Sequence, residues 1–261
     1  MRYPDGFFGW VDLVTTDGFA ATALYSRPFH WETEAVPTPM GPAYTLCRKD
    51  GQLVAGIGPQ PPGMAEAGMP SLWNSYVMVD DADATCAAAT RAGGSVAMPA
   101  MDVMTQGRMA MVADPSAAVV GLWQRRDHDG ADLFNAPGSL TWNELQTRDL
   151  AAATAFYAAV FGWRWEEVPD GDGYQVAHLD TKPGEDTSNA GAMTMPAMVP
   201  AEVPAYWAVY FAVADCDDAV ERATGLGAQV FLPAMQMGPG RFAGLTDPTG
   251  AMVMVGSFQT G

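Results

Sequence analysis

The chain has 261 residues, of which 49% are hydrophobic, and a formal net charge of −17. The composition is that of a soluble globular protein, and so negative a field repels phosphate, which excludes nucleic acid as a partner. No apolar run is long enough for a membrane span, no secretory signal is visible, and three scattered cysteines favour a reducing cytoplasm.

The first half predicts a strand, a helix and three strands, and then the same series again. Asp17 caps a helix after the first strand, and Pro28 is expected to end it near Arg27. A second, alanine-rich helix starts at Asp80 and ends at Gly93. Strands are expected near residues 10–15, 31–35, 42–48, 52–58, 73–79, 95–102, 107–113 and 118–124.

The second half repeats the first. The segment that starts Trp10-Val11-Asp12-Leu13 returns 132 residues later as Trp142-Asn143-Glu144-Leu145, and matched aromatic residues end the helix that follows each. Such a repeat predicts two tandem domains of one fold, at residues 1–125 and 139–261, joined by a linker at 126–138. Residues 180–204, rich in Met and Pro, are expected to form a long loop that covers a cleft.

These markers resemble the vicinal oxygen chelate superfamily, which includes glyoxalase I, bleomycin-resistance proteins and extradiol dioxygenases. The resemblance rests on Trp-x-(Asp/Glu)-Leu, the capping Asp, the Tyr-x3-Phe-x-Trp at the helix end, and an Asp-Pro before the last strand. It is closest to the tandem two-domain branch, whose members are loosely called hydroxylases. The resemblance implies an α+β fold in which two βαβββ modules per domain curl their sheets into a ligand-binding cup.

The family name refers to a divalent metal bound by His and Glu side chains. In this chain the family's metal positions hold Trp10, Asn74, Gly121, Trp142, Ala208 and Met254. None of these is a normal ligand for a catalytic divalent metal, which needs imidazole, carboxylate or thiolate donors. We therefore expect a metal-independent member with no cofactor, in which glyoxalase or dioxygenase chemistry does not follow from the resemblance.

The residues expected to face the cups follow from strand alternation. An acid next to aromatic side chains can act as a general base, with a tyrosine as proton donor. The predicted catalytic residues are Glu144, Asp12, Tyr210 and Tyr76. The predicted substrate-binding residues are Trp10, Trp142, Asn74, Trp123, Gln146, Met252 and Met254. Such amphipathic pockets suit a hydrophobic aromatic or polyketide-type small molecule.

Several hypotheses stay open on the sequence alone. The chain is a metal-independent enzyme of antibiotic-type metabolism, with lyase, isomerase or cofactor-free oxygenase activity; a binding protein that sequesters such a compound; or a structural protein whose cups are filled by its own side chains. Asp12 and Glu144 could instead only pair with Arg108 and Arg241, which recur at matching positions. A monomer or a homodimer is expected.

Overall fold

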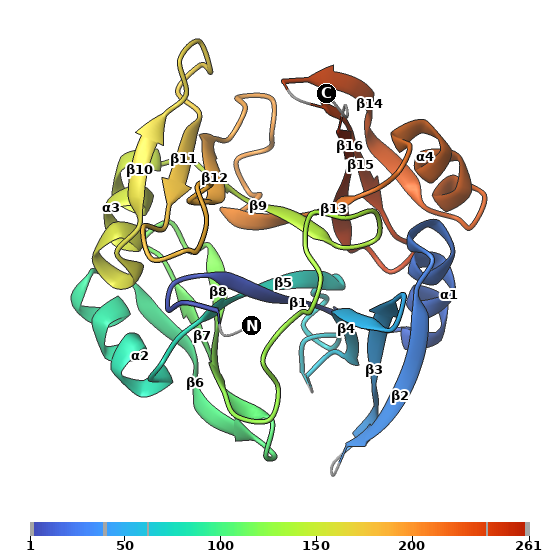
Figure 1. The fold of residues 1–261 in the computed structure, drawn as a ribbon, viewed down its shortest axis with the longest axis horizontal. Coiled ribbons are helices and arrows are strands. Elements are labelled where there is room, and N and C mark those ends of the chain that lie inside the picture. Colours follow the sequence, from blue (N-terminus) through green and yellow to red (C-terminus); the bar gives the residue numbers. More distant parts are fainter. Residues whose placement is uncertain (1–2, 39–40, 62, 239, 259–261) are drawn as a thin grey trace. The chain divides into compact units, whose positions relative to one another are not determined.

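A computed structural model describes residues 3–38, 41–61, 63–238 and 240–258. Its elements follow the predicted order of strand, helix and three strands, four times over (Figure 1). The first half contains β1 (Phe8–Thr15), α1 (Gly18–Phe29), β2 (Glu32–Thr38), β3 (Gly41–Lys49), β4 (Gln52–Pro59), β5 (Leu72–Met78), α2 (Ala82–Arg91), β6 (Ser95–Val103), β7 (Gly107–Ala113) and β8 (Val119–Arg125). The second contains β9 (Leu140–Thr147), α3 (Leu150–Phe161), β10 (Arg164–Glu167), β11 (Gln175–His178), β12 (Ser188–Thr194), β13 (Tyr206–Ala212), α4 (Cys216–Thr224), β14 (Gln229–Met237), β15 (Gly240–Thr246) and β16 (Met252–Phe258).

Each half of the sequence forms one eight-stranded mixed sheet. The strand order is β2-β3-β4-β1-β5-β8-β7-β6 in the first and β10-β11-β12-β9-β13-β16-β15-β14 in the second. The two sheets thus have one topology, and the α+β tandem fold predicted from the repeat is confirmed. In each sheet the first strand of a module pairs in parallel with the last: β1 with β4, β5 with β8, β9 with β12 and β13 with β16.

Two local predictions are wrong. Helix α1 does not end before Pro28 but continues to Phe29 with the proline inside it. Proline lacks one backbone donor, but the helix end is held by other bonds, from the N–H of His30 to Arg27 O and of Trp31 to Ser26 O. Burial of Phe29 in the core also favours this last turn.

The long loop predicted at residues 180–204 contains strand β12. Its sequence, Ser-Asn-Ala-Gly-Ala-Met-Thr, has none of the β-branched or aromatic residues typical of a strand except the final threonine. Small residues are needed there because Ala190 and Ala192 are completely buried and the ring of Tyr174 lies against Gly191. Packing therefore outweighs intrinsic propensity in this strand.

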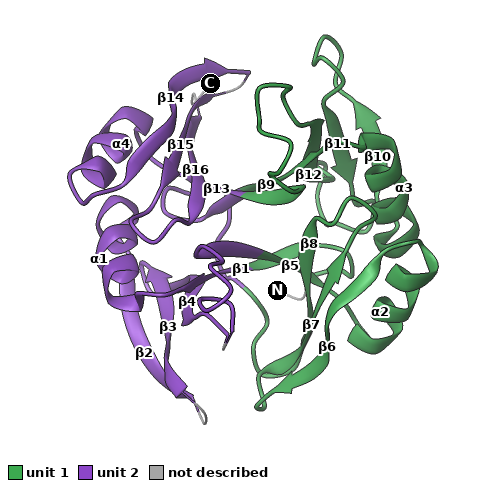
Figure 2. Ribbon diagram, turned by 180° about the vertical axis from the view of Figure 1, so that it is seen from behind, with its two compact units in different colours: residues 1–10, 75–130, 142–208 green, residues 11–74, 131–141, 209–261 purple. Residues whose placement is uncertain are grey.

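The chain divides into two compact units, each of which takes segments from both halves of the sequence (Figure 2). Unit 1 comprises residues 1–10, 75–130 and 142–208, and unit 2 comprises residues 11–74, 131–141 and 209–261. Each unit contains its own cluster of buried apolar side chains. Within the described residues, no helix combines the length and the apolar character needed to cross a membrane.

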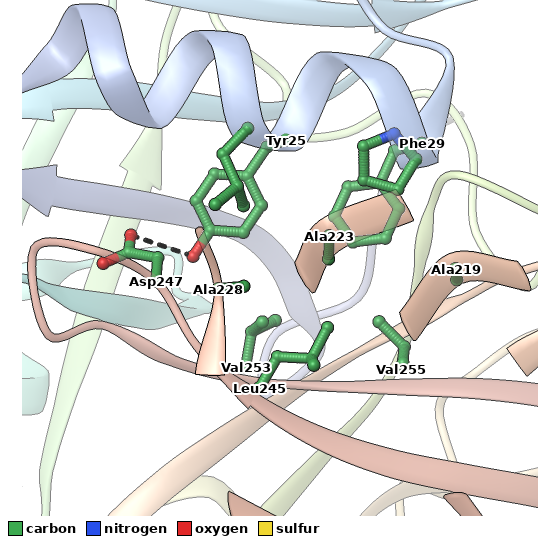
Figure 3. A pocket seen from close by; sticks show the side chains of 11 residues that line it. Tyr25, Phe29, Ala219, Ala223, Ala228, Leu245, Asp247, Val253 and Val255 are labelled. Carbon is green, nitrogen blue, oxygen red and sulfur yellow. Dashed lines mark hydrogen bonds between the residues drawn. The ribbon is translucent and has the colours of Figure 1, made fainter. Parts of the chain in front are cut away.

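A buried network in unit 2 explains several of the repeated sequence markers. The indole Nε1 of Trp73 donates to the hydroxyl of Tyr25 at 3.2 Å, and this hydroxyl donates to Asp247 Oδ2 at 3.1 Å. Figure 3 shows Tyr25 directed from α1 toward Asp247, beside an apolar void of only about 10 Å³. Burial, and then the charge of Asp247, raise the pKa of Tyr25 well above its usual value.

Unit 1 contains the matching arrangement. Trp207 Nε1 donates to the hydroxyl of Tyr157 at 2.8 Å, and burial, followed by the charge of Asp114, raises the pKa of that tyrosine. Oδ1 of Asp114 accepts the backbone N–H groups of Ser116 and Ala118. The repeated Trp, Tyr and Asp-Pro residues are thus structural: in each unit they join a helix of one half to a loop of the other.

Candidate functional site

The predicted acid Asp12 lies in unit 2 at the centre of a small polar cluster. Its strand β1 contributes Val11 and Leu13 to the core, so the carboxylate projects from the opposite face of the sheet. Asp12 is only 8% exposed, and its oxygens accept from the hydroxyl of Tyr44 at 3.1 Å and from Nδ2 of Asn74 at 3.0 Å. Such donors reduce the cost of burying the carboxylate.

The predicted acid Glu144 forms the corresponding cluster in unit 1. It is 7% exposed, with Oε2 accepting from the hydroxyl of Tyr174 at 2.9 Å and Oε1 from Nε2 of Gln146 at 2.6 Å. The indole Nε1 of Trp142 donates to the same tyrosine oxygen at 2.9 Å. A chain of donors therefore runs from Trp142 through Tyr174 to Glu144, and each donor polarises the next.

Glycine makes room for the tyrosine in both clusters. Gly56 on β4 is paired with Asp12, and Gly191 on β12 is paired with Glu144. A Cβ atom at Gly56 would collide with the hydroxyl of Tyr44, and one at Gly191 would collide with the hydroxyl of Tyr174. Neither glycine has a positive φ, so what requires it is space rather than backbone conformation.

Two tyrosines near Glu144 have a raised pKa. Burial, followed by the charge of Glu144, raises the pKa of both Tyr174 and Tyr206. Both side chains are half-buried, and both stay protonated near neutral pH. They can therefore donate a hydrogen bond or a proton, whereas an ionised Glu144 can accept one.

The predicted aromatic residues of unit 1 pack around a histidine. Trp10 and Trp123, which are 3% and 5% exposed, both lie edge-on to the ring of His128, with centroids at 4.5 and 5.4 Å. The indole N–H of Trp123 also donates to the carbonyl oxygen of His128 at 2.9 Å. Tyr76, also buried, packs on Gly121, with which it is paired.

The remaining predicted residues lie in unit 2. Tyr210 is paired with Met254, and its ring is edge-on to Phe242 at 6.1 Å. Met254 is buried, whereas Met252 is 44% exposed. The pairing of Asp12 with Tyr76, and of Glu144 with Tyr210, stays a prediction.

The expected alternative partners of the two acids are wrong. Arg108 forms hydrogen bonds with Asp83 and Asp102, and Arg241 forms a bidentate pair with Asp217. Each arginine thus binds an acid in the first turn of a nearby helix, α2 or α4, where the aspartate is a favoured residue. Among the described residues, the partners of the two arginines are these aspartates rather than Asp12 or Glu144.

The family's metal positions do not fit a metal. The indole N–H of Trp142 already donates to Tyr174 and offers no lone pair, and Asn74 lies toward Asp12 as a hydrogen-bond donor through Nδ2. Gly121 lies beneath the ring of Tyr76, so a ligating side chain cannot be accommodated at this position without moving that ring. Within the described ranges, no group of three His, Cys, Asp or Glu side chains could hold a metal ion.

Sequence reasoning missed Tyr44, Tyr174 and Tyr206. The first two share a position in their sheets. Tyr44 lies two residues before Leu46, which pairs with Gly56, and Tyr174 lies two residues before Val176, which pairs with Gly191. A surface depression of about 680 Å³ on unit 2 lies elsewhere, at the C-terminal ends of α1 and α4, and none of the predicted site residues lines it.

Comparison with known proteins agrees with this fold. The model of the Glyoxalase/Bleomycin resistance protein/Dioxygenase superfamily matches residues 8–121 and 139–255. CFP32 of Mycobacterium tuberculosis, whose name provisionally calls it a glyoxylase, is 44% identical over 97% of this chain and 95% of its own length. The anthracycline biosynthesis protein DnrV of Streptomyces peucetius is 36% identical over 100% of this chain and 96% of its own.

Solved structures show the same fold at much lower identity. The Mn(II)-bound glyoxalase of Novosphingobium aromaticivorans superposes with a TM-score of 0.64 at 14% identity, covering 98% of this chain and 83% of that one. The 2,3-dioxygenase LapB of Pseudomonas sp. KL28 has the same TM-score at 15% identity, covering 98% and 94%.

Proposed function

We propose that this chain, which belongs to the glyoxalase/bleomycin resistance protein/dioxygenase superfamily, binds a hydrophobic aromatic or polyketide-type small molecule and acts on it without a metal. The observation that carries the proposal is the Glu144 carboxylate, which is 7% exposed and held by Tyr174 and Gln146. The similarity to a protein named for anthracycline biosynthesis supports a flat, polycyclic and phenolic substrate class.

The proposed chemistry is acid–base catalysis at Glu144. The carboxylate accepts a proton from an acidic C–H beside a ligand carbonyl, and the electron pair of that bond moves toward the carbonyl oxygen. Tyr206 stays protonated because burial and the charge of Glu144 raise its pKa, so it is suited to donate to that oxygen. Return of the proton at another carbon completes an isomerisation or starts a ring closure, with no oxidant or reductant consumed.

The metal-independent part of the proposal rests on the donor set. Where relatives with a metal need lone pairs, this chain has an indole N–H and a carboxamide N–H that already donate to Tyr174 and Asp12. A site built on these groups recognises hydrogen-bond acceptors and donors of an organic ligand instead.

Glu144→Gln is the test that distinguishes an enzyme from a binding protein. With a tetracyclic hydroxyquinone as the ligand, we expect turnover to be lost while affinity stays within about tenfold, or 1.4 kcal/mol, because the amide keeps the shape but not the proton acceptor. Unchanged turnover would remove Glu144 as the base. Tight binding without turnover by the unmodified protein would instead identify a sequestering protein, and no binding at all would favour cups filled by their own side chains.

A further inference from the structure

We infer that the chain carries two ligand sites of one chemical class, one at Glu144 in unit 1 and a second at Asp12 in unit 2. The inference rests on the proposed function for the class of ligand, but not for the existence of the second site. The ligand class of the second site is a flat apolar molecule with a hydrogen-bond donor, such as a phenolic hydroxyl, that the carboxylate of Asp12 accepts.

The first observation is that both carboxylates are served by the same pair of donor types. Each accepts one hydrogen bond from a tyrosine hydroxyl and one from a side-chain carboxamide. The tyrosine comes from an equivalent position in the two sheets, across an equivalent glycine. Burial of a carboxylate on a sheet face is costly, and both units meet this cost in the same way.

The second observation is that the carboxamide does not come from an equivalent position. In unit 2 it is Asn74 on β5, whose counterpart in the repeat is Ala208. In unit 1 it is Gln146 on β9, whose counterpart is Val14. The two copies have therefore diverged at both positions and still supply one amide donor to the acid. Inheritance of a frozen core contact does not explain this exchange, whereas a requirement for the charged, oriented carboxylate at both sites does.

The surroundings of Asp12 suit an apolar ligand. Val14, Leu46 and Leu72 are half-buried, and strand alternation places them on the same face as the carboxylate because their neighbours Leu13, Cys47 and Trp73 belong to the core. A nearly buried charge within a half-exposed apolar surface is typical of a small-molecule site, where few polar groups fix the orientation of an apolar body.

The corresponding surface around Glu144 is more aromatic. Val176, Met193 and Tyr206 are half-buried there, and the half-buried indole of Trp142 lies beside Tyr174. Large rings bury more apolar area than aliphatic side chains do, so we expect the Glu144 site to bind a flat ligand more tightly than the Asp12 site.

The experiment is a calorimetric titration of the whole chain with two probes. One is 2-naphthol, a flat apolar molecule with one phenolic O–H, and the other is 2-methoxynaphthalene, which lacks the donor. We expect two equivalents of 2-naphthol per chain, and a preference for it over the methoxy probe at both sites. Asp12→Asn should lower 2-naphthol affinity by about tenfold at one site only, and Glu144→Gln should do so at the other.

Asn74→Ala and Gln146→Val are the matched second variants, because each installs the residue that the other copy already has at that position. They keep the carboxylate, and each should weaken the binding of 2-naphthol at its own site only. Thermal melts check that the variants are folded.

Binding of one equivalent that is lost in Glu144→Gln and unaffected by Asp12→Asn would overturn the second site and leave the proposed function intact. One equivalent that depends only on Asp12 would overturn the placement of the function at Glu144, and no binding by the unmodified chain would overturn both.

Discussion

The surroundings of Asp12 and Glu144 show how two copies of one sheet can keep a chemical feature while changing the residues that provide it. Both carboxylates accept a hydrogen bond from a tyrosine whose ring packs on a glycine of the neighbouring strand. Both also accept a hydrogen bond from a carboxamide N–H. They differ in the strand that supplies the amide and in the added indole donor of Trp142. The feature shared between the copies is thus a hydrogen-bonded acid, which a residue-by-residue alignment of the repeat does not reveal.

The two buried Trp–Tyr–Asp networks offer the comparison with the largest expected effect. Tyr25→Phe removes the donor to Asp247 Oδ2 and leaves a nearly buried carboxylate oxygen without it. We expect a loss of about 3 kcal/mol in the free energy of unfolding, measured by urea denaturation at pH 7. Tyr157→Phe should cost only about 1 kcal/mol, because the buried Oδ2 of Asp114 makes no hydrogen bond within the described residues. Equal losses in the two variants would contradict this difference.

Alanine at the two glycines beneath the tyrosines should have the next largest effect. The new Cβ at Gly191 would meet both Tyr174 and Trp142, whereas the three atoms nearest to a Cβ at Gly56 all belong to Tyr44. We expect Gly191→Ala to cost about 2 kcal/mol and Gly56→Ala about 1 kcal/mol in chemical denaturation.

A double-mutant cycle provides the control for the glycine prediction. If Gly191 acts by holding Tyr174 on Glu144, Gly191→Ala should cost much less in a Tyr174→Phe background, because the bond it disrupts is already absent. Full additivity would show that the glycine serves packing alone.

The fold was largely predictable from the sequence, since the 132-residue repeat and the periodic strands specify two copies of one α+β unit. The geometry of the candidate site was predictable only in part. Asp12, Glu144, Asn74 and Gln146 follow from strand alternation. Tyr44 and Tyr174 do not, because their role depends on which glycine of a neighbouring strand lies beneath them, and this register is set by pairing across the sheet rather than along the chain.

A similar reason explains the wrong expectation for the arginines. Arg108 and Arg241 recur at matching positions, as a partner of the repeated acids would. Position in the repeat does not say which acid an arginine meets, and the helix aspartates Asp83 and Asp217 lie within reach of them.

Transplanting the amide tests whether its strand of origin matters. Gln146→Val should cost about 1 kcal/mol, because it removes a donor from the Glu144 carboxylate. Adding Ala208→Asn, which places an amide where unit 2 has Asn74, should recover about half of this loss in thermal or chemical denaturation. The matched pair in unit 2 is Asn74→Ala with Val14→Gln. Failure of both second substitutions to restore any stability would show that the two amide positions are not interchangeable.

The smallest effect expected is a pH-dependent one, at Asp114 in the buried network of unit 1. Burial raises the pKa of Asp114 above its ordinary 3.8, although the backbone N–H groups of Ala118 and Ser116 lower it in part. Below pH 3.8 the carboxyl is protonated in both the folded and the unfolded chain, so it adds no difference between them. As the pH rises, the unfolded chain releases the proton first, and the folded state loses stability until the pH has passed the raised pKa.

Asp114→Asn keeps an oxygen that can accept hydrogen bonds from the two backbone N–H groups, but it has no proton to lose. The stability of this variant relative to the unmodified chain should therefore increase as the pH rises and level off once the pH has passed the raised pKa of Asp114, as measured by urea unfolding at a series of pH values. A difference that stays constant, or that falls as the pH rises, would show that the surroundings of Asp114 do not disfavour its charged form.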